Sequence, residues 1–268
     1  MEEIRQLAKD IRLSSLRMVH AANASHIGSA LSISDIVAVL YGRILNINPA
    51  EPSDELRDRF ILSKGHACVA IYSALAARGF FPVEELDNYA KDHSNLMTHI
   101  SHKVPGVEFS TGSLGHGLPF GSGKALSAKR LGKCWRTFVL MSDGELGEGS
   151  NWEAMMFAAH NGLDNLIAII DYNKLQSLTS VEKTLRLEPL ADKARAFGWA
   201  VNEVDGHDHS AIIQALSVAP WELGKPSFLI AHTTKGKGVS FMENSVDWHY
   251  KSPSAKQLAQ GVEEINDA

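Results

Sequence analysis

Residues 137–176 have the sequence TFVLMSDGELGEGSNWEAMMFAAHNGLDNLIAIIDYNKLQ, which places a glycine-containing turn and a helix-like segment between two apolar runs. The runs 137–142 and 165–171 are continuously apolar rather than alternating, as is typical of strands buried on both faces of a sheet. The intervening segment 150–162 has helical periodicity and is long enough to connect parallel strands. This stretch therefore predicts a strand–helix–strand unit with parallel strands.

The same alternation of strand-like and helix-like segments extends through most of the chain. It predicts an α/β fold with a doubly wound, mostly parallel sheet and helices on both faces. Because no linker-like or repeated segment interrupts it, we expect residues 1–268 to form a single domain. The expected strands are 59–63, 137–142, 165–171, 200–204 and 227–233, and the expected helices are 34–45, 66–78, 114–128, 150–162, 188–198 and 209–219, with an amphipathic helix at the N-terminus.

The composition is that of an ordinary soluble globular protein. Of the 268 residues, 44% are hydrophobic and 21% are charged, and the formal net charge of −5 argues against a nucleic-acid partner. The two cysteines, Cys68 and Cys134, are too few for a disulfide scaffold or a structural zinc site and suit a reducing compartment. We see no secretory signal and no apolar run of bilayer length, so we expect a cytoplasmic protein with no membrane partner.

Oxygen-bearing side chains follow the two strands of the 137–176 unit. Asp143 comes directly after the first strand, and Asn173 follows the second. Since parallel strands bring their carboxyl ends to one edge of the sheet, these side chains should converge there as ligands for a hard divalent cation. The glycines of the turn allow the backbone to approach a diphosphate, and the start of the following helix favours its negative charge. The pattern predicts a site for a diphosphate and a divalent cation.

The stretch from Ser142 to Gln176 resembles the thiamine diphosphate (ThDP) motif, and in particular the version found in transketolases. The resemblance implies that the side chains of Asp143 and Asn173 and the carbonyl of Leu175 hold Mg²⁺, or alternatively Ca²⁺, against the cofactor. The chain departs from the motif at Ser142, where the family has a glycine. The cofactor-binding residues implied by the resemblance are His66, Gly112, Ser113, Leu114, Gly115, Ser142, Asp143, Gly144, Glu145, Asn173 and His249.

Four histidines lie in segments that resemble loops lining the transketolase pocket. These segments are SHIGS (25–29), LSKGH (62–66), the residues preceding VPGVE (104–108), and DWH (247–249). The resemblance implies catalytic roles, and imidazoles suit them because they exchange hydrogen bonds and protons with sugar hydroxyls near neutral pH. His102 lies three residues after His99, so the alignment of the third segment with the family loop could be shifted by three residues. His116 replaces a family glutamine in GSLGHG (112–117). The four candidates are His26, His66, His99 and His249.

The resemblance covers nearly the whole chain but only the first part of a full-length transketolase. It implies that the pyrimidine-binding half, with the glutamate that activates the cofactor, belongs to a partner chain. We therefore expect the N-terminal subunit of a two-chain transketolase in an α₂β₂ assembly, with sugars as substrates. The resemblance also assigns Glu148 to an acidic network that couples the paired active sites.

Other functions stay open at this stage. A subunit of a 1-deoxyxylulose-5-phosphate synthase or a 2-oxoacid dehydrogenase would use the same cofactor, but SHIGSALS (25–32) and LDNLIAIIDYNKLQ (163–176) favour transketolase. A non-catalytic paralogue that serves assembly or regulation should lack the metal ligands, whereas Asp143 and Asn173 are both present. Ordinary pentose-phosphate, apulose-type and sulfonated sugars all remain candidate substrates.

Overall fold

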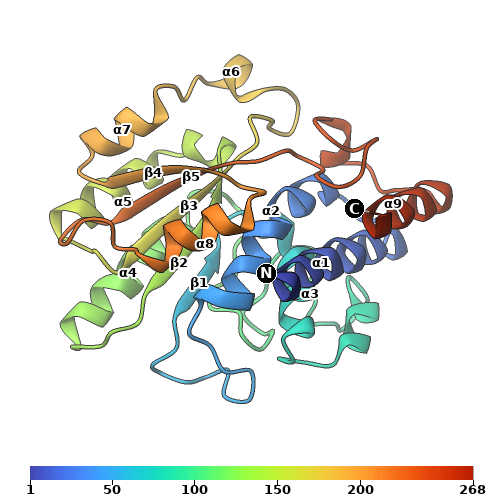
Figure 1. The fold of residues 1–268 in the computed structure, drawn as a ribbon, viewed down its shortest axis with the longest axis horizontal. Helices are drawn as coiled ribbons and strands as arrows, with labels where there is room; N and C mark the ends of the chain where they lie inside the picture. The colour runs from blue at the N-terminus through green and yellow to red at the C-terminus, as the bar shows by residue number, and fades with distance from the viewer. Residues whose placement is uncertain (268) are drawn as a thin grey trace.

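Residues 1–267, the part of the chain that this computed structural model describes, form a parallel five-stranded sheet with helices on both faces (Figure 1). The strand order is β1-β2-β3-β5-β4, and each neighbouring pair runs parallel. The predicted fold class and all the predicted strands are confirmed. The strands are β1 (Arg59–Leu62), β2 (Thr137–Ser142), β3 (Leu166–Tyr172), β4 (Ala200–Asp205) and β5 (Ser227–His232).

Each helix expected from the sequence is present, although several begin elsewhere than predicted. The largest difference is α2, which begins at Ile27 instead of residue 34, because every residue of its first turns is buried and no polar face marks its start. The helices are α1 (Glu2–Ala21), α2 (Ile27–Val39), α3 (Cys68–Ala77), α4 (Gly117–Arg130), α5 (Gly149–His160), α6 (Val181–Thr184), α7 (Leu190–Ala196), α8 (His209–Ser217) and α9 (Ala255–Asp267). Short segments of other helix types are Leu40–Ile44, Gly65–Ala67, Val83–Asn88, Gly144–Gly147 and Asp247–His249.

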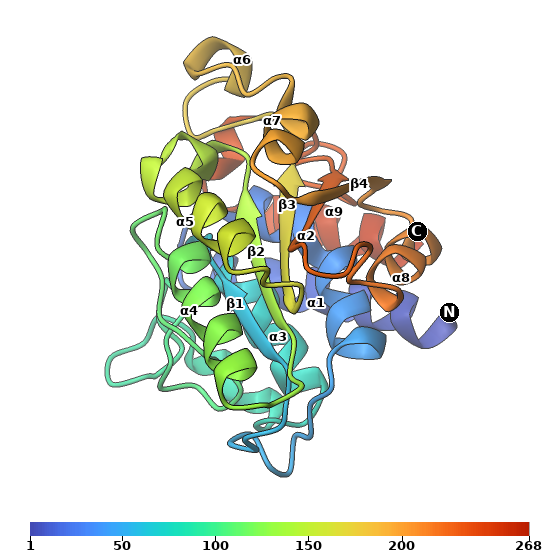
Figure 2. The ribbon, with the colours of Figure 1, turned by 90° about the vertical axis from the view of Figure 1, so that its left-hand side faces the viewer.

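The sheet separates two hydrophobic cores, because successive side chains of a strand point to opposite faces. In β2, Phe138 and Leu140 enter one core, while Val139 and Met141 enter the other. Helices α1, α2, α3, α8 and α9 contribute to the first core, and α4, α5 and α7 to the second. Figure 2 shows α4 and α5 on one side of the sheet and α8 on the other. Burial on both faces explains why the strand sequences are continuously apolar.

The helix formed by α2 and the π-turn after it corrects one expectation from the sequence. Residues Ile27–Ile44 form a continuous 18-residue helix with a mean hydropathy of 1.4, which is long and apolar enough to cross a bilayer. However, 89% of this segment is buried inside the protein, against α1, α3 and α8. The structure therefore uses it as a core helix.

Asp35 of α2 joins several elements through its carboxylate, which is only 5% exposed. It forms an ion pair with Arg12 of α1 and lies 2.8 Å from Nδ1 of His207 and 2.8 Å from Nε2 of His209. The backbone N–H of Thr234 donates to Nε2 of His207 (2.8 Å), so His207 carries its proton on Nδ1 and donates it to Asp35. Burial alone would raise the pKa of Asp35, but its hydrogen bonds and the charge of Arg12 hold it well below its ordinary value.

We expect Asp35→Ala to lower the free energy of unfolding by about 3 kcal/mol or more, because it leaves a nearly buried guanidinium without its carboxylate partner. Urea denaturation followed by far-UV circular dichroism measures the change. Asp192→Ala is the matched control, because the side chain of Asp192 is 71% exposed and its ion pair with Arg195 should contribute less than about 1 kcal/mol. Equal losses in the two variants would contradict a stabilising role of the Asp35 network.

Candidate active site

A cavity of about 300 Å³ opens at the carboxyl ends of the strands, where ligands bind in sheets of this type. It contains all four predicted histidines together with Asp143, Asn173 and Leu175. Two larger hollows, of about 460 and 600 Å³, lie beside Asp35 and along residues 81–105, but neither contains the predicted site residues. The lining residues of the cavity are His26, Ser29, Lys64, His66, His99, Gly112, Leu114, Ser142, Asp143, Gly144, Asn173, Leu175, Gln176, Ser177, Lys235, His249 and Tyr250.

The four histidines form one cluster although they come from four separate segments. The ring centroid of His26 lies 5.0 Å from that of His66, 4.9 Å from that of His249 and 5.9 Å from that of His99. His26 has a left-handed backbone (φ 73°), which is unfavourable for a residue with a side chain. Its N–H donates to the carbonyl of His249 (2.8 Å), which holds this conformation and ties the start of α2 to the 247–249 turn.

Burial keeps the imidazoles of the cluster neutral near pH 7. It lowers the pKa of His26 to about 4 and that of His249 to about 3, and the positive charges of Lys64 and Lys235 contribute. Burial and Lys64 likewise lower the pKa of His66 well below its ordinary value, and burial lowers that of His99. A neutral imidazole offers one donor and one acceptor nitrogen, so the cluster can both donate to and accept from the hydroxyls of a sugar.

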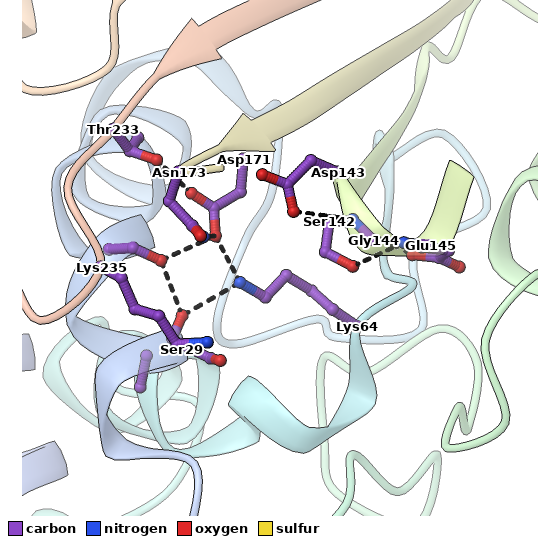
Figure 3. Close-up of polar contacts among 12 residues, drawn as sticks. Ser29, Lys64, Ser142, Asp143, Gly144, Glu145, Asp171, Asn173, Thr233 and Lys235 are labelled. Atoms are coloured by element: carbon purple, nitrogen blue, oxygen red, sulfur yellow. Dashed lines mark hydrogen bonds and ion pairs between the residues drawn. The ribbon is translucent and has the colours of Figure 1, made fainter. Parts of the chain in front are cut away.

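Asp143 and Asn173 lie at the mouths of the neighbouring strands β2 and β3 (Figure 3). The Asp143 carboxylate, only 1% exposed, accepts hydrogen bonds from the backbone N–H groups of Gly144 (2.7 Å) and Lys174 (2.5 Å). The side-chain carbonyl of Asn173 accepts from the N–H of Leu175 (3.0 Å), and its amide donates to Asp171 (3.0 Å). Burial and the neighbouring Asp171 carboxylate raise the pKa of Asp143 to about 7.

These residues fit a divalent cation bound together with phosphate. Burial and the Asp171 carboxylate raise the pKa of Asp143 despite the opposing charge of Lys64, and a bound cation would favour the ionised form of this carboxyl. Among residues 1–267, no group of three or more His, Cys, Asp or Glu side chains could hold a metal by itself. Mg²⁺ suits such an incomplete set, because it usually takes few protein ligands and completes its octahedron with phosphate oxygens and water.

Two buried lysines of the cavity were not among the residues predicted from the sequence. Lys64 is 1% exposed, forms an ion pair with the fully buried Asp171 and donates to the carbonyl of Ser29 (3.1 Å) (Figure 3). Lys235, also 1% exposed, donates to the carbonyls of Leu175 (3.3 Å) and Gln176 (3.1 Å). Burial and the charge of Lys64 lower the pKa of Lys235 to about 8. Both lysines follow predicted strands closely, which was the available signal, because that edge of the sheet is where ligands bind.

Three of the predicted cofactor contacts do not line the cavity. Ser113 is exposed, and the buried Gly115 donates its N–H to the Glu145 carboxylate (2.9 Å). Glu145 also accepts from the Ser63 hydroxyl, and burial raises its pKa. The side chain of Glu145 therefore holds the 112–117 loop from outside the cavity, while Gly112 and Leu114 of that loop line the cavity.

The remaining candidates lie outside the cavity, where their side chains are exposed. His102 contacts the Ser110 hydroxyl (2.7 Å), so the structure brings His99 and not His102 into the cluster. Nδ1 of His116 lies 3.1 Å from the carbonyl of Ser113 and thus faces its own loop. Glu148 lies at the start of α5, and its role in coupling the active sites stays a prediction.

The lowered pKa values of His26 and His249 predict that the protein becomes less stable below about pH 6.5. In the unfolded chain each imidazole binds a proton near pH 6.5, whereas in the folded protein His26 does so only near pH 4 and His249 near pH 3. The unfolded state thus holds more protons between these values, and the free energy of unfolding should decrease as the pH falls through this window.

Urea denaturation at a series of pH values measures this decrease. His26→Gln should make it shallower, because one group with a shifted pKa is removed. Leu223→Ala, which replaces a non-titrating side chain that is 89% exposed, should leave it unchanged. A pH dependence unaffected by His26→Gln would show that this imidazole does not have a lowered pKa.

Comparisons with known proteins show which family this chain resembles over most of its length. Residues 4–264 match the family model described as transketolase, thiamine diphosphate binding domain. One subunit of the apulose-4-phosphate transketolase of Phocaeicola vulgatus is 43% identical over 252 residues, which cover 94% of this chain and 90% of that protein. The 6-deoxy-6-sulfo-D-fructose transketolase subunit SqwG of Clostridium sp. (strain MSTE9) is 38% identical over 264 residues, 98% of this chain and 96% of that protein.

Solved structures show the same similarity at the level of the fold. Transketolase from Campylobacter jejuni superposes with a TM-score of 0.93 at 31% identity, over 99% of this chain and 43% of that chain. Transketolase from Leishmania mexicana superposes with a TM-score of 0.94 at 28% identity, over 99% of this chain and 42% of that chain. The chain thus spans less than half of these solved transketolases but nearly all of the Phocaeicola vulgatus and Clostridium subunits.

Proposed function

Because this chain belongs to the transketolase family and corresponds to its thiamine diphosphate-binding part, we propose that it is the N-terminal subunit of a two-chain transketolase. The enzyme would transfer a two-carbon ketol unit from a ketose donor to an aldose acceptor. The observation that carries this proposal is the single cavity in which His26, His66, His99 and His249 lie beside Asp143 and Asn173. It combines groups for a sugar with groups for a diphosphate and its cation.

The partner in this proposal is a C-terminal subunit that carries the pyrimidine-binding half. Its support is the difference in length, since this chain covers 43% of the Campylobacter jejuni transketolase but 90% of the Phocaeicola vulgatus subunit. Residues 1–268 would then be one diphosphate-binding domain, and the assembly would be α₂β₂. Glu148, exposed at the start of α5, would face a second copy of the active site within it.

The cofactor-binding end of the cavity would balance the charge of a diphosphate. Asp143, Asn173 and the carbonyl of Leu175 would hold Mg²⁺. That carbonyl also accepts from the Lys235 ammonium at 3.3 Å, so Lys235 lies beside the place where the cation and the diphosphate would bind. Lys64 is already neutralised by Asp171, which leaves Lys235 as the cavity lysine available to the diphosphate.

Bound ThDP would supply the nucleophilic carbon and the electron sink for cleavage of a carbon–carbon bond. The residues of this chain would bind and orient the sugar and move its protons. A neutral imidazole can accept the proton of the donor hydroxyl that becomes a carbonyl, and another can donate a hydrogen bond to the carbonyl under attack. His26 lies among the other three rings, so it is placed best for this proton transfer.

The first experiment is to measure ThDP binding and ketol transfer with this chain alone and with its candidate partner chain. We expect tight Mg²⁺-dependent ThDP binding, and turnover of xylulose 5-phosphate or of the donors named for the relatives, only in the mixture. Turnover by the isolated chain would refute the requirement for a partner. A mixture that fails to bind ThDP would refute the proposed function.

Asp143→Asn should weaken Mg²⁺-dependent ThDP binding to the mixture by about a hundredfold or more, because even the loss of a residue that only orients a metal ligand costs about 10- to 100-fold. The replacement keeps the size of the side chain and one of the two oxygens that accept from the N–H groups of Gly144 and Lys174. It also removes a charge that burial disfavours, so the fold should persist. Quenching of tryptophan fluorescence during ThDP titration measures the affinity. The exposed Asp192→Asn serves as the control, and an unchanged ThDP affinity in Asp143→Asn would exclude Asp143 as a metal ligand.

A further inference from the structure

Tyr250 stands at the mouth of the cavity, beside two of the clustered imidazoles. Its ring centroid lies 4.9 Å from that of His249, in edge-to-face contact, and 6.2 Å from that of His26. The residue is 59% exposed, whereas both imidazoles are half-buried. Among the residues of the described part of the chain that line the cavity, only Tyr250 has a six-membered aromatic ring. A large ring left exposed beside a polar cavity suggests a surface that a ligand covers.

The backbone around Tyr250 is held firmly in place. The N–H of Tyr250 donates to the carbonyl of Asp247 (3.2 Å), within the turn that carries His249. Trp248 of the same turn is 6% exposed and donates its indole N–H to the carbonyl of Phe241 (2.8 Å). The carbonyl of His249 accepts from the N–H of His26 (2.8 Å), so the turn is also joined to the start of α2. The ring is therefore presented in a preformed position, which lowers the cost of ordering it when a ligand binds.

The phenol of Tyr250 has the chemistry that a sugar requires. Its face is apolar and can pack against the C–H groups of a ketose, while its hydroxyl both donates and accepts hydrogen bonds. It loses little conformational entropy on binding, since only two side-chain torsions are involved. The deeper imidazoles suit the polar atoms of the reacting ketol unit, so a ring nearer to solvent meets the carbons beyond that unit.

We propose that Tyr250 is a specificity-determining residue that forms one wall of the donor-ketose subsite. Its ring packs against the sugar carbons beyond the ketol unit, and its hydroxyl bonds to one of their hydroxyls. This inference rests on the proposed function, and it adds the part of the substrate that the residue contacts. Ketose donors that differ only at these carbons are discriminated by their fit against this ring.

The test uses the two-chain complex loaded with thiamine thiazolone diphosphate, an inert cofactor analogue, so that ketoses bind without turnover. Calorimetry then gives the affinities of xylulose 5-phosphate, fructose 6-phosphate and apulose 4-phosphate for the wild-type, Tyr250→Phe and Tyr250→Ala complexes. Leu223→Ala, which truncates another exposed apolar side chain, is the control. ThDP affinity and the association of the two chains are measured for every variant.

We expect Tyr250→Ala to weaken ketose binding by about tenfold and by different factors for the different ketoses, with ThDP affinity and the association of the two chains within about twofold of wild type. Tyr250→Phe should lose less, because it keeps the packing face. In the active complex, the KM for the donor should rise in Tyr250→Ala more than kcat falls.

Ketose affinities in Tyr250→Ala that match those of the wild type would overturn the inference. A weakened association of the two chains, with unchanged ketose affinity, would make Tyr250 an interface residue and overturn it as well. A wild-type complex that binds ThDP but no ketose would refute this subsite while leaving the cofactor site intact. A mixture that binds neither would refute the proposed function itself.

Discussion

The buried ion pair between Lys64 and Asp171 holds the carboxyl edge of the sheet together. Lys64 follows β1 and Asp171 lies in β3, and these strands are separated by β2. Asp171 also accepts hydrogen bonds from the hydroxyls of Ser32 in α2 and Thr233 after β5, and Lys64 donates to the carbonyl of Ser29. Charges buried this deeply are tolerated only when they are paired and fully hydrogen-bonded, so the segments that supply these partners must meet at one place. The cavity forms where they meet.

The pair also determines the charge that is left for a ligand. Because Lys64 is neutralised by Asp171, the site retains Asp143 with a pKa raised to about 7 and Lys235 with a pKa lowered to about 8, both mainly by burial. Each would gain from an opposite charge, Asp143 from a cation and Lys235 from an anion. A metal diphosphate brings both charges together. The electrostatics of the protein alone are thus complementary to the cofactor that the family binds.

The strands and the positions of Asp143 and Asn173, the two candidate oxygen ligands, could be predicted from the sequence because they depend on local features. A continuous apolar run as short as 166–172 indicates a buried strand rather than a buried helix. Polar residues that follow such a strand lie at the carboxyl edge of the sheet. The start of α2 could not be predicted in this way. Its first turns are buried on every side because they are enclosed by α1, α3 and α8, so apolar residues and serines are buried alike and no amphipathic period marks the helix.

By itself the sequence determined the fold class and the positions of Asp143 and Asn173, since strand burial and turn chemistry are local. Its resemblance to transketolase loops indicated the four segments that carry the clustered histidines. Only the tertiary structure decided that His99 and not His102 joins the cluster, that Glu145 supports a loop from behind, and that Lys64 and Lys235 line the cavity. These outcomes depend on which side chains of distant segments meet. Burial and pairing arise from packing in three dimensions, so spacing along the chain does not reveal them.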